Sequence, residues 1–203
     1  MLDHLVYAAL DLSGAIEDLE RRLAVRPALG GQHAGGLTHN ALLSLGEGSY
    51  LEIIARVPEA PADALPFGLG ALTEPRLVTW AVAVNDIDSR VVDARARGYN
   101  PGDVIPGGRD LPGGGRLEWR LALTPRPSGD GVVPFLIQWT SQPHPSLTSP
   151  QGCRLVGLRA EHPQPDDARA KLTALAVDLQ VVAGAAPRLI ATIDTPRGTV
   201  DLS

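Results

Sequence analysis

The sequence predicts an α+β protein in which strand–helix–strand modules repeat around a cupped sheet. Two observations carry this prediction. A strand-like opening recurs at residues 2–10, 77–84 and 154–160, and each opening is followed by capping residues, a helical pattern and a Pro or Gly stop. The connections between strand groups are long and there are only three such helices, which favours α+β over a doubly wound sheet.

The first module, residues 1–56, shows the pattern most clearly. After the opening strand and the cap at 11–13, Ile16, Leu19 and Leu23 recur at helical spacing, and Pro27 with Gly30-Gly31 ends the helix. Two further strands are expected, joined by a hairpin turn that contains glycine; they span 38–45 and 49–55, with the turn at 46–48. The expected period is β-α-β-β-β.

The second module, residues 76–141, repeats this order with a helix that stops at Gly98. Its later strands are expected at 116–123 and 132–140, and the glycines at 107–108 and 113–115 are interpreted as hairpin loops. The third module, residues 153–203, is shorter. It is expected to be a partial βα unit packed on the core of the same structural unit, with a helix from Asp166 and short strands at 179–182, 188–194 and 199–202.

Composition and charge exclude several classes of function. The net charge of −5 lacks the basic footprint of a nucleic-acid-binding protein. A single cysteine, Cys153, excludes an internal disulfide framework and a Cys-rich zinc site. The glycine-rich stretch 30–36 is not a dinucleotide fingerprint, so no nucleotide cofactor is expected. With no long apolar run and no basic leader, we expect a cytoplasmic protein that does not bind membranes.

An ordered set of segments resembles the glyoxalase-like domain proteins of the vicinal-oxygen-chelate superfamily. The segments that carry the resemblance are DHLVY at 3–7, DL at 11–12, GGQH at 30–33, THNALL at 38–43 and GSYLEI at 48–53. The resemblance implies two βαβββ modules whose eight strands form an incomplete barrel around a ligand cavity. It also implies a divalent metal held by His or Glu from the first and last strand of each module, although some relatives bind drugs without a metal.

Carried onto this sequence, the resemblance places His4 and Glu52 at the metal-ligand positions of the first module, where they are also the expected catalytic pair. In the second module the matching positions fall on Trp80 and near Gln138, so the ligand set is incomplete. The residues themselves support a His4–Glu52 pair, because burial of a carboxylate among apolar neighbours is costly unless it is paired, protonated or metal-bound. The pair is expected to bind a metal or to act as a general acid and base.

Five further residues are candidates for substrate binding. His39 and Asn40 open an otherwise apolar strand and are expected either at the mouth of the cavity or as a strand-edge cap. Trp80 and Trp139, with Gln138 beside them, are expected to form an apolar wall, with core packing as the alternative. His33 lies in the glycine-rich stretch, which allows a bend or a mobile lid.

Three functions remain open at the level of the sequence. The first is a lyase-, isomerase- or dioxygenase-type enzyme with an incomplete metal site around His4 and Glu52. The second is a metal-free protein of the same fold that binds a hydrophobic small molecule. A scaffold with a vestigial cavity is a third reading, and a homodimer is left open. Fold alone does not decide among them.

Overall fold

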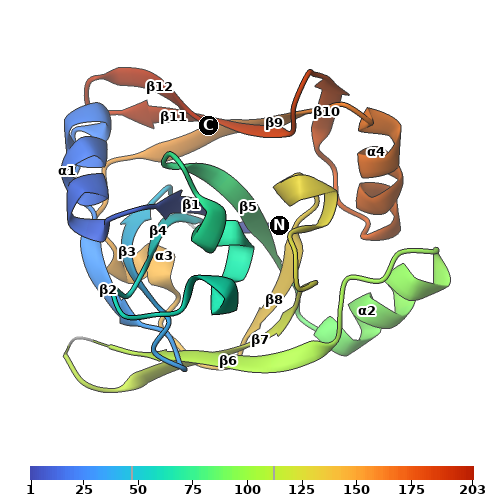
Figure 1. Ribbon diagram of the computed structural model, residues 1–203, viewed down its shortest axis with the longest axis horizontal. Helices are drawn as coiled ribbons and strands as arrows, with labels where there is room; N and C mark the ends of the chain where they lie inside the picture. The colour runs from blue at the N-terminus through green and yellow to red at the C-terminus, as the bar shows by residue number, and fades with distance from the viewer. Residues whose placement is uncertain (47, 112) are drawn as a thin grey trace.

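The structure, a computed structural model, describes residues 1–46, 48–111 and 113–203. It contains an eight-stranded sheet in the order β2-β3-β4-β1-β5-β8-β7-β6 and a four-stranded sheet in the order β10-β9-β11-β12. The larger sheet curls into a nearly closed barrel (Figure 1). The predicted α+β class and incomplete barrel are therefore confirmed.

The described elements follow the chain in alternating groups of strands and helices. The eight-stranded sheet contains β1 (Leu2–Ala9), β2 (Ala28–Gln32), β3 (Thr38–Ser44), β4 (Tyr50–Arg56), β5 (Arg76–Ala83), β6 (Val104–Asp110), β7 (Arg116–Ala122) and β8 (Phe135–Trp139). The four-stranded sheet contains β9 (Arg154–His162), β10 (Gln180–Ala183), β11 (Arg188–Thr195) and β12 (Gly198–Leu202). The helices are α1 (Leu12–Leu23), α2 (Ile87–Ala96), α3 (Pro145–Thr148) and α4 (Pro165–Ala174), with short 3-10 turns η1 (Ala62–Ala64), η2 (Pro66–Ala71) and η3 (Ser128–Gly131).

The first strand, β1, lies at the centre of the large sheet and sets which side chains face each side. It pairs with β4 in parallel and with β5 in antiparallel fashion. Val6 and Ala8 point to the concave face, whereas Leu5 and Tyr7 point to the convex face, as strand alternation requires. Between Leu2 and His4 the pairing with β5 shifts register, so Asp3 lies at a bulge. A bulge turns a side chain away from its regular direction, which matters for the site described below.

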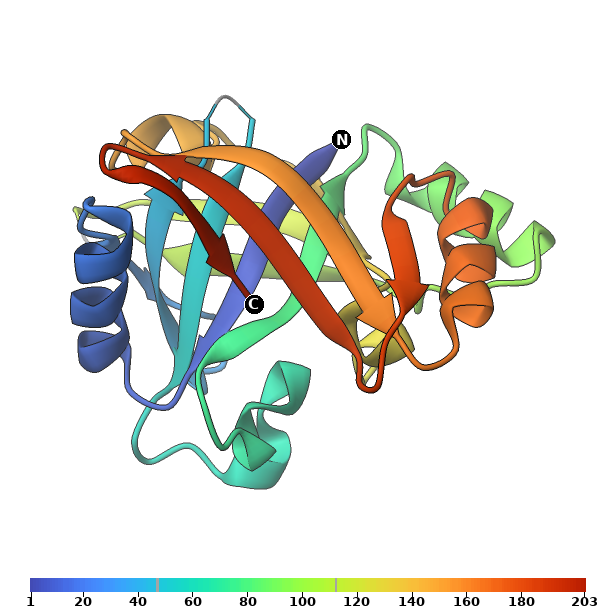
Figure 2. The ribbon, with the colours of Figure 1, turned by 90° about the horizontal axis from the view of Figure 1, so that it is seen from above.

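The convex face carries the main hydrophobic core. The side chain of Asp11 accepts a hydrogen bond from the backbone N–H of Gly14 and caps α1, whose apolar face packs on the sheet through Ile16, Leu19 and Leu23. Figure 2 shows the C-terminal sheet crossing over β1 and β5 on this side. The C-terminal unit contains the four strands and the helix expected from the sequence, and its strands, β9 to β12, form a sheet of their own.

Two strands lie in glycine-rich segments where the sequence shows no strand pattern. Gly30 and Gly31 lie within β2, and Gly107 and Gly108 lie within β6, so the interpretation of Gly107-Gly108 as a hairpin loop is wrong. Close packing explains the glycines: a Cβ atom at Gly30 would lie 2.3 Å from Oδ1 of Asn40. These strands are the two edges of the sheet, and they meet at one bridge between His33 and Arg109. The expected turn at 46–48 includes Glu47, which lies outside the described residues.

Replacement of Gly107 by alanine is expected to destabilise the protein by about 1–3 kcal/mol, because the new Cβ would overpack the barrel wall. That atom would lie 2.2 Å from Nε1 of Trp119. Gly157 in β9 is the matched control, because a Cβ there meets no atom within 4 Å. Urea unfolding of Gly107→Ala and Gly157→Ala measures both effects, and equal stabilities would contradict the packing argument.

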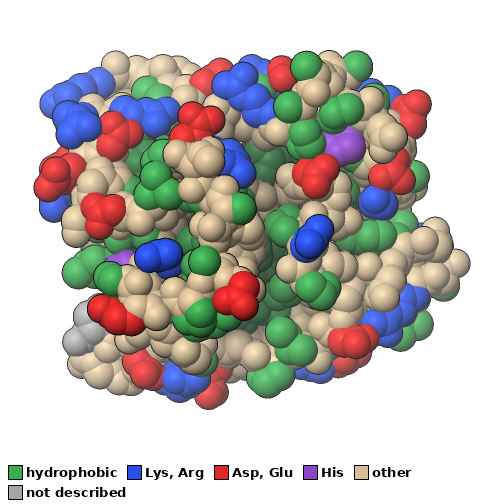
Figure 3. All heavy atoms as spheres, viewed as in Figure 1, with side chains coloured by type: hydrophobic (Ala, Val, Ile, Leu, Met, Phe, Trp, Pro, Cys, Tyr) green, Lys and Arg blue, Asp and Glu red, His purple; other side chains and the backbone are tan. Residues whose placement is uncertain are grey.

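The surface of the molecule is mixed in charge. Figure 3 shows acidic and basic side chains interspersed over the face that is viewed there. Among the described residues, no helix is both long enough and apolar enough to cross a membrane.

Candidate functional site

A cavity of about 360 Å³ lies on the concave side of the barrel. Polar side chains from β1, β3, β4 and β6 line one part of it, and apolar side chains from β7, β8 and η2 line the rest. One other hollow, of about 450 Å³, lies between the large sheet and the C-terminal unit, and a second, of about 790 Å³, lies beside Pro187 and Arg188. The carboxylates that line these two hollows are exposed. The barrel cavity is therefore the place where buried titratable groups converge.

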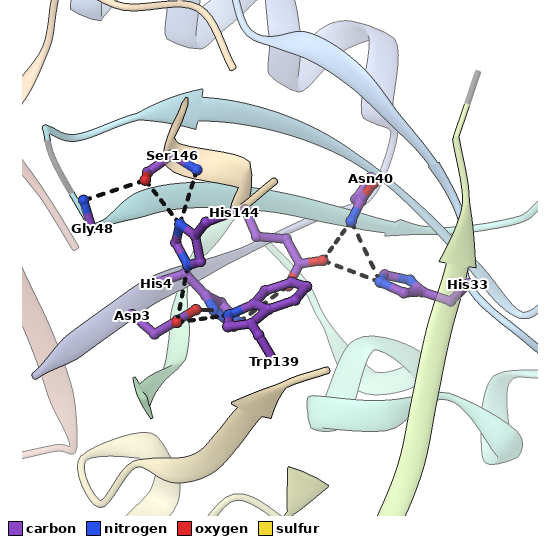
Figure 4. Close-up of polar contacts among 9 residues, drawn as sticks. Asp3, His4, His33, Asn40, Gly48, Trp139, His144 and Ser146 are labelled. Carbon is purple, nitrogen blue, oxygen red and sulfur yellow. Dashed lines mark hydrogen bonds and ion pairs between the residues drawn. The ribbon is translucent and has the colours of Figure 1, made fainter. Parts of the chain in front are cut away.

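Asp3 is the centre of the first polar network, which reaches the cavity through His4 and Trp139. Its Oδ1 atom lies 2.6 Å from Nδ1 of His4, and its Oδ2 atom accepts a hydrogen bond from Nε1 of Trp139 at 2.9 Å. The same Oδ2 atom lies 3.1 Å from Nε2 of His144. Figure 4 shows the side chains of Trp139 and His144, from a distant part of the chain, pointing toward Asp3 beside that of its neighbour His4. Since Asp3 is 1 % exposed, its negative charge is stabilised almost entirely by these hydrogen-bond donors and not by water.

The protonation of this network follows from its contacts. Burial raises the pKa of Asp3, but hydrogen bonds from His144 and His4, together with the positive charge that His4 can carry, outweigh burial and lower that pKa far below its usual value. Nδ1 of His144 accepts from the backbone N–H of Ser146, so Nε2 of His144 carries the proton donated to Asp3. An ionised Asp3 likewise holds the proton of His4 on Nδ1, which leaves Nε2 of His4 as the reactive nitrogen.

Glu52 is the centre of the second network. Its Oε1 atom accepts a hydrogen bond from Nδ2 of Asn40 at 2.6 Å and lies 3.2 Å from Nε2 of His33. Nδ1 of His33 contacts Oγ1 of Thr38 at 2.9 Å, so both ring nitrogens of His33 are occupied by the protein. Burial raises the pKa of Glu52, yet the hydrogen bond and charge of His33, with His4 and Asn40, lower it to about 2. Glu52 is therefore ionised at neutral pH.

The two networks meet between His4 and Glu52. Nε2 of His4 lies 3.8 Å from Oε2 of Glu52, which is beyond hydrogen-bond length but within reach of a strong charge interaction in a buried site. The ring of Tyr50 stacks on His4 with centroids 4.7 Å apart, which fixes the imidazole plane. Burial, with the charges of Asp3 and Glu52, raises the pKa of Tyr50 well above its usual value, so Tyr50 stays neutral.

The remaining walls combine one cation with an apolar surface. Arg109 of β6 is 4 % exposed and lines the cavity from the edge of the barrel. Aromatic and aliphatic side chains form the opposite wall; they are Phe67, Trp119, Leu121, Phe135, Ile137 and Trp139. Trp119 and Trp139 contact each other with centroids 5.3 Å apart.

Four of the residues expected from the sequence are brought together here: His4, Asn40, Glu52 and Trp139. His39 is not among them, because it is adjacent to Asn40 on β3 and its side chain points to the opposite, convex face. The expectation that His39 lies at the cavity mouth is corrected accordingly.

Trp80 and Gln138 also lie away from the cavity. The register aligns Trp80 with Leu5, and Ala81 with His4, so Trp80 packs in the convex core and donates a hydrogen bond from Nε1 to the carbonyl of Val132 at 2.8 Å. Gln138 points outward, where it accepts from the backbone N–H of Ile87 and donates to the carbonyl of Asn85 at the start of α2. The expected apolar wall exists, but Trp119 and not Trp80 accompanies Trp139 there.

Sequence reasoning missed Asp3, Arg109 and His144 as site residues, and it considered His33 only as part of a bend or a mobile lid. The Asp3-His4 dipeptide was a usable signal, since a carboxylate next to a histidine on an apolar strand needs a partner. Nothing local in the sequence marks Arg109 or His144, because β6 reaches the cavity, and the segment before α3 reaches Asp3, only through the fold.

The side chains do not fit the metal site that the resemblance implies. Among the described residues, no group of three or more His, Cys, Asp or Glu side chains is placed to hold a metal ion. The second module presents Ala81 opposite His4, and Ile137 paired with Ala83, at the cavity positions where ligands are expected. Alkyl side chains cannot coordinate a cation. His4 and Glu52 alone would leave most of the coordination sphere to water.

Comparison with known proteins agrees with this fold. The sequence matches the family described as a glyoxalase-like domain over residues 2–176. A crystal structure of a hypothetical protein from Staphylococcus aureus is similar, with a TM-score of 0.65 and 14% identity, over 98% of this chain and 83% of that chain. Methylmalonyl-CoA epimerase from Mycobacterium tuberculosis has a TM-score of 0.44 and 20% identity, over 70% of this chain and 88% of that chain. No curated protein matches the sequence.

Proposed function

This chain belongs to the glyoxalase-like domain family, and we propose that it is an enzyme of the isomerase or lyase type. Its reaction would be proton transfer at a carbon next to a carbonyl group of a small molecule. One observation supports this most directly: Asp3 holds the imidazole of His4 with Nε2 in the cavity, 3.8 Å from the ionised Glu52. A carboxylate that orients a histidine is a recurrent arrangement for general acid–base catalysis.

His4 is the proposed base. Its Nδ1 proton is donated to Asp3, so Nε2 is free to take a proton from the substrate and to return it to another position. Tyr50 stacks on the ring and favours the observed orientation of the imidazole plane. Since a positioned base contributes about 10²–10⁴ to a rate, His4 would supply a large part of the acceleration.

Glu52 is proposed to stabilise the protonated His4 and not to act as the base. A carboxylate whose pKa is lowered to about 2 holds a proton weakly at neutral pH. Its Oε1 atom is occupied by Asn40 and His33, whereas Oε2 faces Nε2 of His4. An imidazolium formed at His4 would thus gain a charge partner on each side, Asp3 and Glu52.

Proton exchange tests this proposal without knowledge of the natural substrate. The protein is incubated in D₂O with benzylacetone or benzylpyruvate, which carry a methylene group next to a ketone, and loss of the methylene signal is followed by proton NMR. We expect enzyme-dependent exchange with at least one of the two compounds. No exchange, combined with quenching of tryptophan fluorescence by the same compounds, would instead favour a binding protein.

The same assay tests the metal hypothesis that His4 and Glu52 raise. Exchange is compared before and after treatment with a chelator, and the metal content is measured. We expect exchange to survive chelation, because the second module supplies alkyl side chains where ligands are needed. Loss of exchange on chelation, with recovery on addition of one equivalent of a divalent ion, would establish a metal-dependent enzyme.

A metal-free binding protein is the second candidate, and the apolar wall favours it. Phe67, Trp119 and Phe135 with neighbouring aliphatic side chains would bury much of a small hydrophobic molecule. This candidate predicts binding of benzylacetone without any exchange of its protons. It leaves unexplained why two buried carboxylates and three histidines are maintained beside the wall.

A further inference from the structure

Arg109 is a buried cation that the proposed proton transfer does not use. It belongs to β6, where its register partner is Leu117, a residue of the concave face. Directly opposed residues of an antiparallel pair share a face, so Arg109 points into the barrel. Burial lowers the pKa of Arg109 while the nearby Tyr50 and Glu52 raise it, and its guanidinium remains charged.

The protein uses only part of the hydrogen-bonding capacity of this guanidinium. Across the described residues, its side chain makes one hydrogen bond, from Nη1 to the backbone carbonyl of Gly30, and no ion pair with a carboxylate. A guanidinium has five N–H donors, so the other donors are left to whatever fills the cavity. Buried charges in proteins are normally paired, and Arg109 at 4 % exposure departs from that rule.

We propose that Arg109 anchors a carboxylate group of the substrate, so that the substrate is a small monocarboxylate with an apolar body. That this molecule is a substrate rests on the proposed function, but the preference of Arg109 for a carboxylate does not depend on turnover. The fork of a guanidinium matches the two oxygens of a carboxylate, and paired hydrogen bonds of this kind are stronger and more directional than a single one.

The other charges of the cavity favour a monoanion over a phosphate ester. Glu52, which lines the cavity, and Asp3, which contacts His4, are both ionised, and no carboxylate of the described residues pairs with Arg109. A dianion would add a second negative charge near Glu52, whereas a monoanion would neutralise Arg109 and add none. The wall of Trp119, Leu121 and Ile137 would then receive the apolar body.

A pair of isosteric probes tests this inference. Binding of phenylacetate and of the neutral phenylacetamide is measured by quenching of tryptophan fluorescence, since Trp119 and Trp139 line the cavity. We expect phenylacetate to bind at least about tenfold more tightly, in line with a charge-assisted bidentate pair. Arg109→Met should abolish this ratio, and Arg109→Lys, which keeps the charge without the fork, should retain part of it.

Two controls make the outcome decisive. Arg116→Gln removes an exposed arginine of the same hairpin, which pairs with Asp110, and should leave the ratio unchanged. His4→Gln should keep the ratio even if it stops proton exchange, which separates the anchor from the proposed chemistry. The inference is overturned if wild-type protein does not prefer phenylacetate, including the case in which neither probe binds. It is also overturned if folded Arg109→Met keeps the preference.

Discussion

Replacement of His4 by glutamine is expected to lower enzyme-dependent proton exchange by about 10²–10⁴, the contribution of a positioned acid–base group. Glutamine retains a polar side chain of similar length and can still donate a hydrogen bond to Asp3, but it has no nitrogen that accepts a proton at neutral pH. The rate of methylene exchange in D₂O, measured by NMR at saturating probe, gives the effect.

His39→Gln is the matched control for this substitution. His39 is a half-buried histidine of β3 in the same sheet, and its side chain points to the convex face away from the cavity. Its replacement should leave exchange unchanged. Equal losses in the two variants would show that the effect comes from stability and not from chemistry, and full exchange by His4→Gln would remove His4 from the mechanism.

The contribution of Glu52 to stability is expected to disappear in acid. Its pKa is lowered from 4.5 to about 2 in the folded protein, because His33, His4 and Asn40 together outweigh the opposing effect of burial. A lowered folded-state pKa means that the stabilisation is fully present above pH 4.5 and is lost as the pH falls through about 2. A difference of this size corresponds to a free energy of unfolding on the order of 3 kcal/mol.

Urea unfolding of the wild type and Glu52→Gln as a function of pH measures this contribution. The difference in unfolding free energy between the two proteins should be largest above pH 4.5 and should shrink toward pH 2. Glu59→Gln, which removes an exposed carboxylate in the segment after β4, should follow the wild type throughout. A difference that stays constant with pH would mean that Glu52 is not held as an ion.

Much of the fold could be predicted from the sequence because the repeated order of strand, cap and helix produces recognisable local sequence patterns. The recurrence of strand, cap and helix depends on alternation and helical spacing, which short segments reveal. Strands β2 and β6 escaped because their glycines resemble loop residues, whereas in the fold they make room for Asn40 and Trp119. This packing requirement arises only in the folded protein, where strands that are distant in the sequence lie side by side.

The candidate site was predicted unevenly, because the face of a strand depends on register. Alignment of Trp80 with His4 was wrong by one residue, and a shift of one residue moves a side chain to the other face. The bulge at Asp3 had the opposite effect: it brings Asp3 and His4, two consecutive residues, into one hydrogen-bonded pair. Neither the strand register nor the bulge can be recognised from the hydrophobic periodicity of the sequence.

The meeting of β2 and β6 also affects how much strand edge is exposed for pairing with other chains. Strands at the edge of an open sheet expose unpaired backbone groups that can template pairing with a second molecule. Here the two edges of the large sheet lie against each other at the His33–Arg109 bridge, so each restricts access to the other. The edges of the small sheet are short, with four residues in β10 and five in β12. The closure that encloses the cavity thereby also reduces the backbone surface on which aggregates could grow.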